Sequence, residues 1–542
     1  MKLNFKANFS PTDDSATILT KILTSRRLTP KQQSEFLHPT KPDPKLMSQA
    51  LKISPKSLKQ FSQRIHQALE RQENICIFGD YDADGLTSTA ILWQSLHRLG
   101  AKVMPFIPHR QKHGYGLSKV ALKEILSGQA FNSPFIPSLL ITTDTGIVAH
   151  KEIAWLKDRG VDVLLTDHHQ PEAKLPPADL ILHSTVTSAA GIAFLLAQQL
   201  LGQTNAWPLI ELATIGVVAD QIPLTGINRN LVFYGLQALQ NPTNPGLKQI
   251  YQLAGLNQST ITTYSINFVI APRLNAMGRL KHGLEALRLL CVTDSHKLKS
   301  LALKLETTNR HRQDLTRQSF QQALTTLSPE TNLNIVVSDA YHEGIIGLIA
   351  GKLVEETGKP SIAISIQDEM AKGSARSIEG VDITRFLRTQ ANLLISVGGH
   401  PLAAGFTLKV ENLDSFIANL NRLAKQFDLS SSDHQLVIDG QLSFSQINLD
   451  LYTRLESMAP FGLGNPRPLF FSQAEIVNFR YLGYQNQHLK LQLVENNHQF
   501  EAIWFNFPAD LSPTNLTGFV FHLNLNSWRQ QKKLQLIIHH AF

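Results

Sequence analysis

Three short apolar runs in the first half of the chain each end in acidic or imidazole side chains. The first run, residues 75–78, precedes Asp80, the second precedes Asp144, and the third precedes the Asp-His-His triplet at 167–169. Apolar, β-branched runs of this length are typical of buried parallel strands. Because all parallel strands of an open α/β sheet present their carboxyl ends to one crevice, we expect these distant side chains to meet in space.

The loop after the first run carries three aspartates at alternate positions, Asp80, Asp82 and Asp84. A single aspartate after a strand is usually a helix N-cap, and an Asp-Gly pair is usually a turn. Three carboxylates packed this closely, however, repel one another unless a cation neutralises them. Together with Asp144 and His168 at equivalent strand ends, they favour a metal centre. Oxygen and imidazole ligands suit Mn²⁺ or Mg²⁺ better than structural zinc, so the pattern predicts a two-metal hydrolase.

The composition sets limits on the class of protein. A chain of 542 residues is too long for one core, and two to four domains are expected. The formal charge of +8 favours an anionic partner, although a basic surface also serves solubility. The two cysteines, Cys76 and Cys291, exclude a disulfide framework and a cysteine-rich zinc cluster. The N-terminus lacks the apolar stretch of a secretory signal and no run is long enough to cross a bilayer, so a cytoplasmic protein is expected.

Strands and helices alternate through two segments of the chain, which predicts a parallel, doubly wound sheet in the first. The first segment has expected strands at 75–78, 102–107, 139–142 and 162–166 and helices at 86–99, 148–159, 190–201 and 209–218. Residues 241–256 are rich in Asn, Pro and Gly and predict a connection. A long polar helix is expected over 298–327, and its Arg310, His311, Arg312 and Arg317 suit either a solvated face or phosphate contact.

A second α/β segment begins at residue 333, and strand-like alternation takes over from about Gln435. This last pattern fits a small β-barrel of the oligonucleotide-binding kind or a β-sandwich. Five further motifs also follow the three strand ends. They are Val218-Ala-Asp220, Ala271-Pro-Arg273-Leu-Asn275-Ala-Met-Gly278-Arg279, His342-Glu343-Gly344, Gly373-Ser374-Ala-Arg376-Ser377 and Gly398-Gly399-His400.

In their order, these eight motifs resemble the DHH phosphoesterase superfamily, and within it the family of single-strand-specific DNA exonucleases. The triplet alone is a weak signal, but eight motifs joined to a β-rich C-terminal segment are specific, and they run from about Phe61 onward. The resemblance implies an α/β fold with a parallel-sheet DHH domain, a long connecting helix, a smaller α/β DHH-associated domain and a C-terminal β-barrel of the oligonucleotide-binding fold. The expected bounds are an N-terminal extension at 1–50, then 51–297, 298–328, 329–430 and 431–542.

The resemblance also implies the metal ligands and the catalytic residues. The implied ligands of two divalent ions, Mn²⁺ or alternatively Mg²⁺, are Asp80, Asp82, Asp84, Asp144, His168 and Asp220. The implied catalytic set is Asp82, Asp84, Asp144, His168, His169 and Asp220. In it, His169 is expected to orient a ligand or touch the phosphate. Such a site hydrolyses a phosphodiester by a two-metal mechanism.

A second cluster of donors follows from the later motifs. Guanidinium, hydroxyl and imidazole groups beside glycines can bind an anion without cleaving it, and the resemblance implies a 5′-terminal phosphate here. The expected substrate-binding residues are Arg110, Arg279, His342, Ser374, Arg376, Gly399 and His400. Tyr115 is a further candidate for contact with the strand. Without the resemblance, residues 373–377 equally suit an edge strand with a surface arginine.

The implied activity is 5′→3′ degradation of single-stranded DNA to mononucleotides, in DNA repair and recombination. The implied partner is single-stranded DNA with a 5′ end. Single-strand-binding protein and a helicase are further candidates, and a monomer without membrane association is expected. Two other classes remain open. A DHH phosphodiesterase for short RNA or cyclic dinucleotides usually lacks the C-terminal β-domain, and a non-catalytic binding protein would have lost metal ligands that are all present here.

Two positions depart from the family pattern. Phe78 stands where many relatives carry a histidine, and Asp80 is expected to substitute as ligand. The loop at 183–188 after Leu182 is shorter than usual, which concerns a substrate-facing loop and leaves the metals untouched. In the β-rich tail, deletion from Gln435 onward is expected to spare the catalytic ligands. Its candidate strand contacts are Arg480, Lys490, Arg529, Lys532, Lys533, Tyr484 and Trp528.

Overall fold

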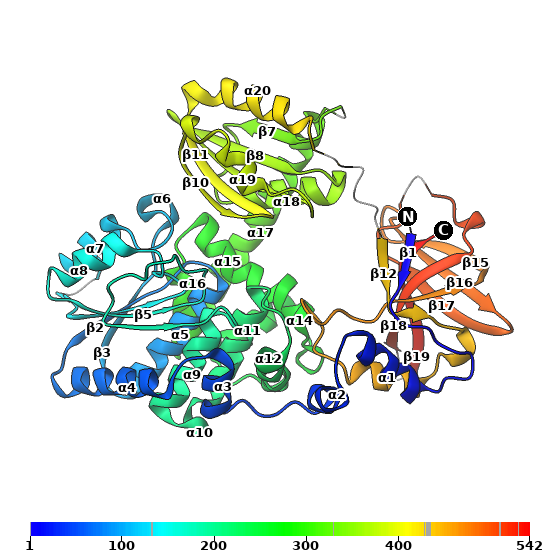
Figure 1. Cartoon of the computed structure of the whole chain (residues 1–542), viewed down its shortest axis with the longest axis horizontal. Helices are drawn as coiled ribbons and strands as arrows, with labels where there is room; N and C mark the ends of the chain where they lie inside the picture. Colours follow the sequence, from blue (N-terminus) through cyan, green and yellow to red (C-terminus); the bar gives the residue numbers. More distant parts are fainter. Residues whose placement is uncertain are drawn as a thin grey trace. The chain divides into compact units, whose positions relative to one another are not determined.

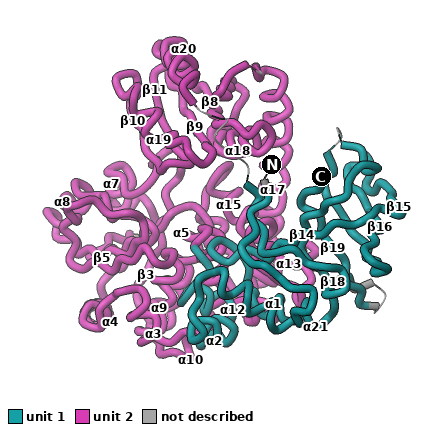
Figure 2. The backbone as a smooth tube through the Cα atoms, turned by 45° about the vertical axis from the view of Figure 1, so that its right-hand side comes forward, with its two compact units in different colours: residues 1–41, 223–233, 433–542 teal, residues 42–222, 234–432 magenta. Residues whose placement is uncertain are grey.

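The computed structural model divides the chain into two compact units (Figure 2). The larger unit contains residues 42–222 and 234–432, and the smaller contains 1–41, 223–233 and 433–542. The structure describes residues 2–131, 134–328, 330–427, 429, 435–508, 511–528 and 531–542, with only the backbone of Lys2, Ser527, Trp528 and Gln531. Two predicted strand contacts, Arg529 and the side chain of Trp528, therefore lie outside the described residues.

The larger unit begins with a five-stranded sheet in which every neighbouring pair is parallel, as expected. Its order is β3-β2-β4-β5-β6. The strands are β2 (Asn74–Phe78), β3 (Lys102–Phe106), β4 (Leu139–Thr143), β5 (Asp162–Asp167) and β6 (Leu180–His183). The chain moves from β2 outward to β3 and then crosses back to β4, so the strand order reverses between β2 and β4. This is the topological switch point at which open α/β sheets bind their ligands.

Helices cover both faces of this sheet (Figure 1). On one face, α7 (Lys119–Leu126) and α8 (His150–Lys157) pack on alternate strand residues such as Cys76 and Leu165. The other face carries α5 (Ala83–Arg98) and α9 (Ala189–Leu201), and α11 (Ile210–Ala219) packs against both of them. The first ten residues of α9 are all buried, which explains its almost uninterrupted apolar sequence.

The expectation of a plain connection at 241–256 is wrong, because helix α13 (Pro245–Ala254) lies there. Asn244 caps this helix by accepting a hydrogen bond from the backbone N–H of Leu247, and Pro245 occupies the first turn. Gly255, with φ of 64°, ends it in the left-handed conformation. The Asn, Pro and Gly residues that suggested a loop are therefore the start and stop signals of a helix.

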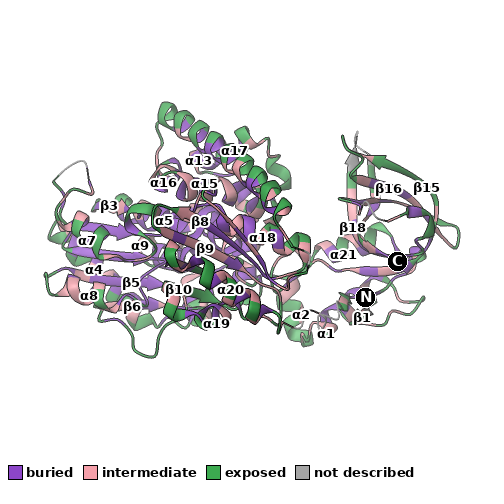
Figure 3. Cartoon of the chain, turned by 90° about the horizontal axis from the view of Figure 1, so that it is seen from above, coloured by how far each residue is buried: buried purple, intermediate pink, exposed green. Residues whose placement is uncertain are grey.

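The expected long helix is confirmed as α17 (Ser295–Thr325), which is 31 residues long. Its outward face is exposed along much of its length (Figure 3). Among the described residues, no helix combines the length and the hydrophobicity that a membrane span requires.

After α17 comes a mixed five-stranded sheet of order β10-β11-β9-β8-β7. Its strands are β7 (Asn334–Ser338), β8 (Ser361–Gln367), β9 (Met370–Arg376), β10 (Leu394–His400) and β11 (Ala403–Lys409), of which only β7 and β8 pair in parallel. Helices α18 (Ile346–Thr357) and α20 (Leu413–Ala424) pack on opposite faces. Because β9 is the central strand, the alternative that 373–377 form an edge strand is wrong.

The smaller unit is built around a seven-stranded sheet of order β13-β14-β18-β19-β17-β16-β15. Its strands are β13 (Gly440–Gln441), β14 (Phe470–Gln473), β15 (Glu475–Leu482), β16 (His488–Glu495), β17 (His498–Trp504), β18 (Gly518–Trp528) and β19 (Gln531–Ala541). A single residue, Ala474, separates β14 from β15, yet the two strands pair with opposite ends of the sheet. The sheet therefore closes on itself as a barrel, and the sandwich alternative is excluded.

The N-terminal segment belongs to the core of this smaller unit. Ile18 and Ile22 of helix α1 (Ser15–Ser25) are fully buried in the same hydrophobic cluster as Phe470 and Phe519 of the barrel. Strand β1 (Lys2–Phe5) also pairs with β12 (Gln435–Ile438). Residues 1–41 are thus part of the same compact unit as the barrel.

Candidate functional site

The six predicted metal ligands converge at the switch point of the parallel sheet. Asp80, Asp82 and Asp84 follow β2, Asp144 follows β4, and the remaining two come from the end of β5 and the end of α11. These side chains form three groups, and within each group the ligand atoms lie within 4.8 Å of one another. The groups are Asp80, Asp82 and Asp144; Asp84, His168 and Asp220; and Asp144, His168 and His169. Shared members join the three groups into one cluster.

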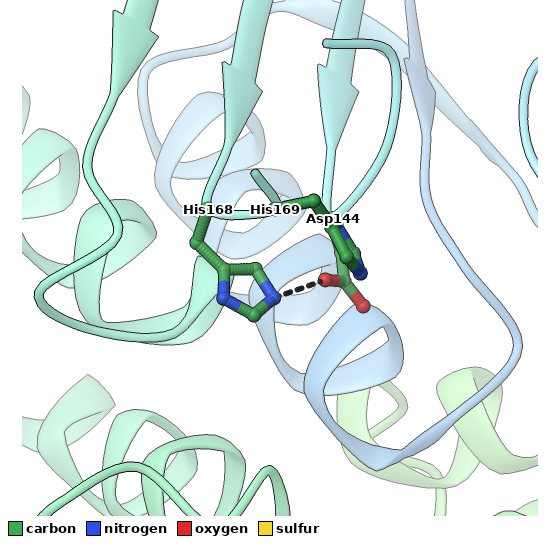
Figure 4. Close-up of side chains that lie close together, drawn as sticks. All are labelled: Asp144, His168 and His169. Carbon is green, nitrogen blue, oxygen red and sulfur yellow. Dashed lines mark hydrogen bonds and ion pairs between the residues drawn. The ribbon is translucent and has the colours of Figure 1, made fainter. Parts of the chain in front are cut away.

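His168 stands at the centre of this cluster, facing Asp144 (Figure 4). Its Nε2 lies 3.0 Å from Asp144 Oδ1 and 3.8 Å from Asp84 Oδ2. On the other side of the ring, Nδ1 lies 3.6 Å from Asp220 Oδ2. One imidazole therefore approaches carboxylates from three different elements, which is the arrangement expected where ligands surround cations.

Backbone groups hold two of the aspartates in place. Asp82 caps helix α5 by accepting a hydrogen bond from the Gly85 N–H at 2.9 Å. The N-terminus of α9 holds Asp84, whose two oxygens accept from Ala189 and Ala190 at 2.8 and 3.0 Å. The N-cap alternative is thus true of Asp82. It does not compete with a ligand role, because a carboxylate offers about four lone-pair sites.

Asp144 has a strained backbone. Its φ of 64° places it in the left-handed region, which non-glycine residues rarely adopt. Such a conformation costs on the order of 1–3 kcal/mol and persists where the surrounding structure imposes it, most often at functional sites. Here the strain turns the carboxylate at the end of β4 toward His168.

The cluster carries more negative charge than its surroundings can neutralise. Burial, followed by repulsion from neighbouring aspartates, raises the pKa of Asp80 to about 8, of Asp84 to about 7 and of Asp220 to about 8. The same causes raise the pKa of Asp144 well above its usual range. Among the described residues, none of these carboxylates forms an ion pair with a lysine or an arginine. Buried oxygen and imidazole donors with uncompensated charge fit divalent cations.

A hydrogen-bonded chain leads from this cluster outward through His169. Its Nδ1 lies 2.7 Å from the Oδ1 of buried Asp167, and its Nε2 lies 3.3 Å from the hydroxyl of Tyr115. Burial alone would lower the pKa of His169, but the hydrogen bond and charge of Asp167 outweigh it and raise that pKa to about 9. Asp167, which sequence reasoning left out of the site, therefore keeps an imidazolium beside the aspartates.

A cavity of about 490 Å³ lies near the cluster within the same unit. Six of the seven predicted substrate-binding residues line it: Arg110, Arg279, Ser374, Arg376, Gly399 and His400. The seventh, His342, is placed differently, because its Nδ1 accepts a hydrogen bond from the Gly344 N–H at 3.0 Å and so shapes the loop before α18. Tyr81, Tyr115 and Lys372 also line the cavity, and the first two connect it to the aspartate loop and to His169.

Positive charge dominates this cavity. Burial and the neighbouring charges of Arg110, Arg312 and Arg376 lower the pKa of the Arg279 guanidinium to about 10. The Nη1 of Arg376 donates to Ser374 Oγ at 3.1 Å and to the Ala375 carbonyl at 2.8 Å. At the N-terminus of α18, a Cβ on Gly347 would lie 3.0 Å from the Arg376 guanidinium, so glycine permits this close approach. Clustered guanidiniums and a helix N-terminus together favour a bound anion.

The two departures from the family pattern leave the ligands intact. Phe78 is fully buried, with its ring centroid 5.3 Å from that of Phe106, so it serves the core of the sheet. In the shortened loop, His183 Nε2 donates to the His169 carbonyl at 2.7 Å. Another residue that sequence reasoning missed is Asn275, whose side-chain oxygen accepts from the Ala83 N–H at 2.7 Å and so braces the aspartate loop.

Gly216 of α11 offers a test of how tightly the ligands are packed. A Cβ at this position would lie 2.4 Å from Asp84 Oδ1 and 2.4 Å from Ala190 Cβ. We expect Gly216→Ala to lower the free energy of unfolding by about 1–3 kcal/mol, because overpacking exceeds the helix-propensity gain of about 1 kcal/mol. Asp84 must also move from its present position in the cluster. Gly351→Ala on α18, where no atom lies within 4 Å, is the matched control and should not destabilise the protein in thermal unfolding.

Models of three protein families match successive segments of the chain. They are the DHH family N-terminal domain over residues 74–219, the DHHA1 domain over 331–426 and the RecJ OB domain over 438–540. The chain is 34% identical over 506 residues to the single-stranded-DNA-specific exonuclease RecJ of Bacillus subtilis, covering 90% of this chain and 63% of that one. It is 31% identical to the Haemophilus influenzae RecJ, covering 87% and 88%.

The fold also matches solved structures of RecJ from Thermus thermophilus. The structure in complex with Mn²⁺ aligns with a TM-score of 0.82 at 27% identity, covering all of this chain and 79% of that one. The structure in complex with Mg²⁺ aligns with a TM-score of 0.75 at 26% identity, covering all of this chain and 78% of that one.

The aspartates and the Asp-His-His triplet cluster at the switch point and face a second domain with a cationic cavity. This arrangement defines a DHH phosphoesterase. The resemblance seen in the sequence motifs is therefore confirmed. The C-terminal barrel and the relatives then narrow the class, and the chain belongs to the RecJ family. It spans 63% of the length of the Bacillus subtilis relative.

Proposed function

We propose that this chain is a metal-dependent exonuclease that degrades single-stranded DNA from its 5′ end to mononucleotides. The observation that carries the proposal is the pairing of two sites in one unit. A crowded carboxylate cluster suits cations that hydrolyse a phosphodiester, and a cationic cavity beside it suits an anion that is held without being cleaved. Tyr81 and Tyr115 lie between the two. The RecJ relatives are named for single-stranded-DNA-specific exonuclease activity.

The ligands of two divalent ions would be Asp80, Asp82, Asp84, Asp144, His168 and Asp220. Mn²⁺ or Mg²⁺ bound there would activate water and neutralise charge on the phosphodiester. Both ions occur in the Thermus thermophilus structures, and we favour Mn²⁺. His169, kept cationic by Asp167, is placed to donate a hydrogen bond to a phosphate oxygen. Asn275 and the N-terminus of α9 fix the carboxylates in advance, so little reorganisation is needed during the reaction.

The cationic cavity would set the direction of digestion. A terminal phosphate monoester carries more charge than an internal phosphodiester, so the guanidiniums of Arg110, Arg279 and Arg376 favour a phosphorylated end. If that end is the 5′ terminus, the next phosphodiester reaches the carboxylate cluster, and each cycle releases one nucleotide. The lining of the cavity supports a phosphate pocket, and membership of the RecJ family supports the 5′ end as its occupant.

Digestion of end-labelled DNA tests the activity directly. Single strands and duplexes labelled at the 5′ or the 3′ end are incubated with Mn²⁺, and the products are separated by size. We expect 5′-labelled single strands to release labelled mononucleotide at once, whereas 3′-labelled strands shorten progressively. Equal digestion of duplexes, or label released first from the 3′ end, would refute the proposed polarity. Activity on short RNA or cyclic dinucleotides alone would instead favour the alternative DHH phosphodiesterase.

Arg376→Ala tests the phosphate pocket. Loss of a charge-assisted hydrogen bond should weaken processing by about 1.5–3 kcal/mol, which is the range for hydrogen bonds to charged groups. The loss in kcat/KM should be larger on 5′-phosphorylated than on 5′-hydroxyl strands, because only the former present the dianion. Arg422→Ala, which removes an exposed arginine on α20 of the same domain, is the control and should leave both substrates unaffected. Equal losses on the two substrates would remove Arg376 from the phosphate-binding role.

Other features complete the proposal. Domain bounds of 51–297, 298–328, 329–430 and 431–542 suit the catalytic domain, connecting helix, phosphate-binding domain and barrel. In the barrel, Tyr484 is fully exposed in the loop between β15 and β16 and is free to stack on a base. Glu501 pairs with both Lys490 and Lys533, which reduces the net charge they present to DNA.

We place the protein in the cytoplasm as a monomer acting in DNA repair and recombination, with single-strand-binding protein and a helicase as candidate partners.

A further inference from the structure

Two large aromatic side chains stack on each other at the surface of the larger unit. Tyr264 of α14 (Thr263–Ser265) and Phe268 of the adjoining π-helical segment Ile266–Ile270 have ring centroids 4.5 Å apart and ring planes inclined by 28°. Their side chains are 66% and 64% exposed. Neither ring is buried in a core, so the pair is not explained by the packing of the fold.

A side-chain hydrogen bond joins the segment that carries the pair to the residue that follows Asp220. Asn267, between the two rings in sequence, accepts a hydrogen bond from the Gln221 side chain at 2.9 Å. Gln221 follows the predicted ligand Asp220 and has a left-handed φ of 55°. The rings themselves stand on a π-helical segment, a rare form that occurs often at functional sites. The segment with the aromatic pair is therefore joined to the neighbour in sequence of Asp220, which supplies a carboxylate to the cluster.

A cationic group accompanies the pair. Arg273 donates to the Val269 carbonyl at 2.8 Å and pairs with Glu306 at 2.8 Å. The second oxygen of Glu306 pairs with Arg310 of α17 at 3.0 Å, and the Arg310 side chain is 71% exposed. Two guanidiniums share one carboxylate, so the group keeps a net positive charge, and Arg273 joins it to the segment that carries the rings through the Val269 carbonyl. Aromatic faces beside a cation are the combination that single-stranded nucleic acids bind.

We propose that Tyr264 and Phe268 form a stacking platform for an unpaired base of the DNA strand, with Arg310 contacting an adjoining phosphate. This inference rests on the proposed nuclease function and adds a contact outside the phosphate cavity, since neither ring is among the residues that line that cavity. A base can stack here only if it is not paired, so the platform selects for single strands close to the metal cluster.

A double-mutant design with abasic DNA tests the platform. The dissociation constant of a labelled single strand is measured with Ca²⁺ in place of the catalytic metal, for the intact protein and for the Tyr264→Ala/Phe268→Ala variant. The same strand with abasic sites is then measured with both proteins. We expect the variant to bind the normal strand about tenfold more weakly than the intact protein does, which is in the range for loss of base stacking. The two proteins should bind the abasic strand equally tightly.

Two controls separate stacking from other effects. Leu303→Ala removes a comparably exposed apolar side chain, 60% exposed, from α17 and should leave affinity unchanged. Phe268→Leu keeps an apolar side chain but cannot stack as a ring does, so it should show most of the loss attributable to Phe268. It also replaces the double variant if that protein does not fold. Thermal unfolding should be alike for all of these proteins, because the rings are at the surface.

The outcomes distinguish this inference from the proposed function. If the intact protein neither binds nor cleaves single strands, the proposed function itself is wrong. If the intact protein does both and the aromatic variants bind normal strands equally well, the platform is wrong while the function stands. An equal loss of affinity on normal and abasic strands also overturns the platform, because the rings would then contribute apolar or structural contacts and not base stacking.

Discussion

Replacing Asp144 by asparagine should reduce metal-dependent cleavage of single-stranded DNA by at least about a thousandfold, equivalent to about 4 kcal/mol of transition-state stabilisation. Asp144 belongs to two of the three groups of ligand atoms and lies 3.0 Å from His168. Its loss should disrupt cation binding in both of those groups. Asparagine is preferred to alanine here because it has the same shape and tolerates the φ of 64° observed at this position.

The measurement is the rate of mononucleotide release at matched Mn²⁺, with circular dichroism to show that the variant is folded. Asp158→Asn, which changes an exposed aspartate at the end of α8, is the control for loss of one carboxylate and should retain full activity. The Asp144 variant should also unfold at a higher temperature than the intact protein in the presence of a chelator, because one source of repulsion is gone. Activity within about tenfold of the intact protein would contradict a ligand role.

Local patterns were sufficient to predict that the aspartates and His168 meet at one edge of the sheet. Apolar runs ending at Asp80, Asp144 and His168 identify parallel strands, and the geometry of a parallel sheet then brings their carboxyl ends together. This inference needs no knowledge of side-chain directions, because every strand of the sheet exposes the same end. The parallel-sheet part of the fold could therefore be predicted from short segments and one rule of topology.

The support around the cluster could not be predicted in this way. The hydrogen bond from His169 to Asp167 depends on two side chains, close in sequence, turning toward each other at the end of β5. The different role of His342 depends on a hydrogen bond within its own loop. Strand periodicity contains no information about such directions. The motifs shared with the family give the list of residues, and the structure shows what each one contacts.

Long-range packing also escaped sequence reasoning. The apolar face of α1 contains Ile18 and Ile22, and nothing local indicates that it packs into a barrel that begins more than 400 residues later. Similarly, Arg229 is almost fully buried and donates to the carbonyls of Phe36, Ser457 and Met458. Deletion from Gln435 onward would therefore expose apolar residues of the N-terminal segment. Point substitutions such as Tyr484→Ala are a cleaner test of the barrel.

The charge of the metal cluster predicts an unusual dependence of stability on pH. In the unfolded chain these carboxyls titrate near 3.8, whereas in the folded protein Asp80 and Asp220 titrate at about 8 and Asp84 at about 7. Between these values the folded state holds protons that the unfolded chain has released. The free energy of unfolding therefore falls as pH rises from about 4 to about 8. His169, with its pKa raised to about 9, acts in the same direction above pH 6.5.

His168 opposes this trend only at lower pH, because its pKa is lowered to about 4 by burial and by His169. Above pH 6.5 the imidazole is neutral in both states, so the aspartates and His169 decide the slope between pH 6.5 and 8.5. Each proton that the folded state holds and the unfolded chain has lost lowers stability by about 1.4 kcal/mol per pH unit. In the presence of a chelator, we expect the Tm of the larger unit to fall by about 5 °C or more between pH 6.5 and pH 8.5.

Scanning calorimetry at pH 6.5 and 8.5, with chelator and with Mg²⁺, measures this effect. Added Mg²⁺ should raise the Tm more at pH 8.5 than at pH 6.5, because the ligands must lose their protons to bind a cation. The Asp144→Asn variant should show a shallower fall in the chelator, since the remaining carboxylates repel one another less. Because the barrel unit has no such cluster among its described residues, its transition should not follow this pattern. The same pH dependence with and without Mg²⁺ would show that these carboxylates do not hold the metal.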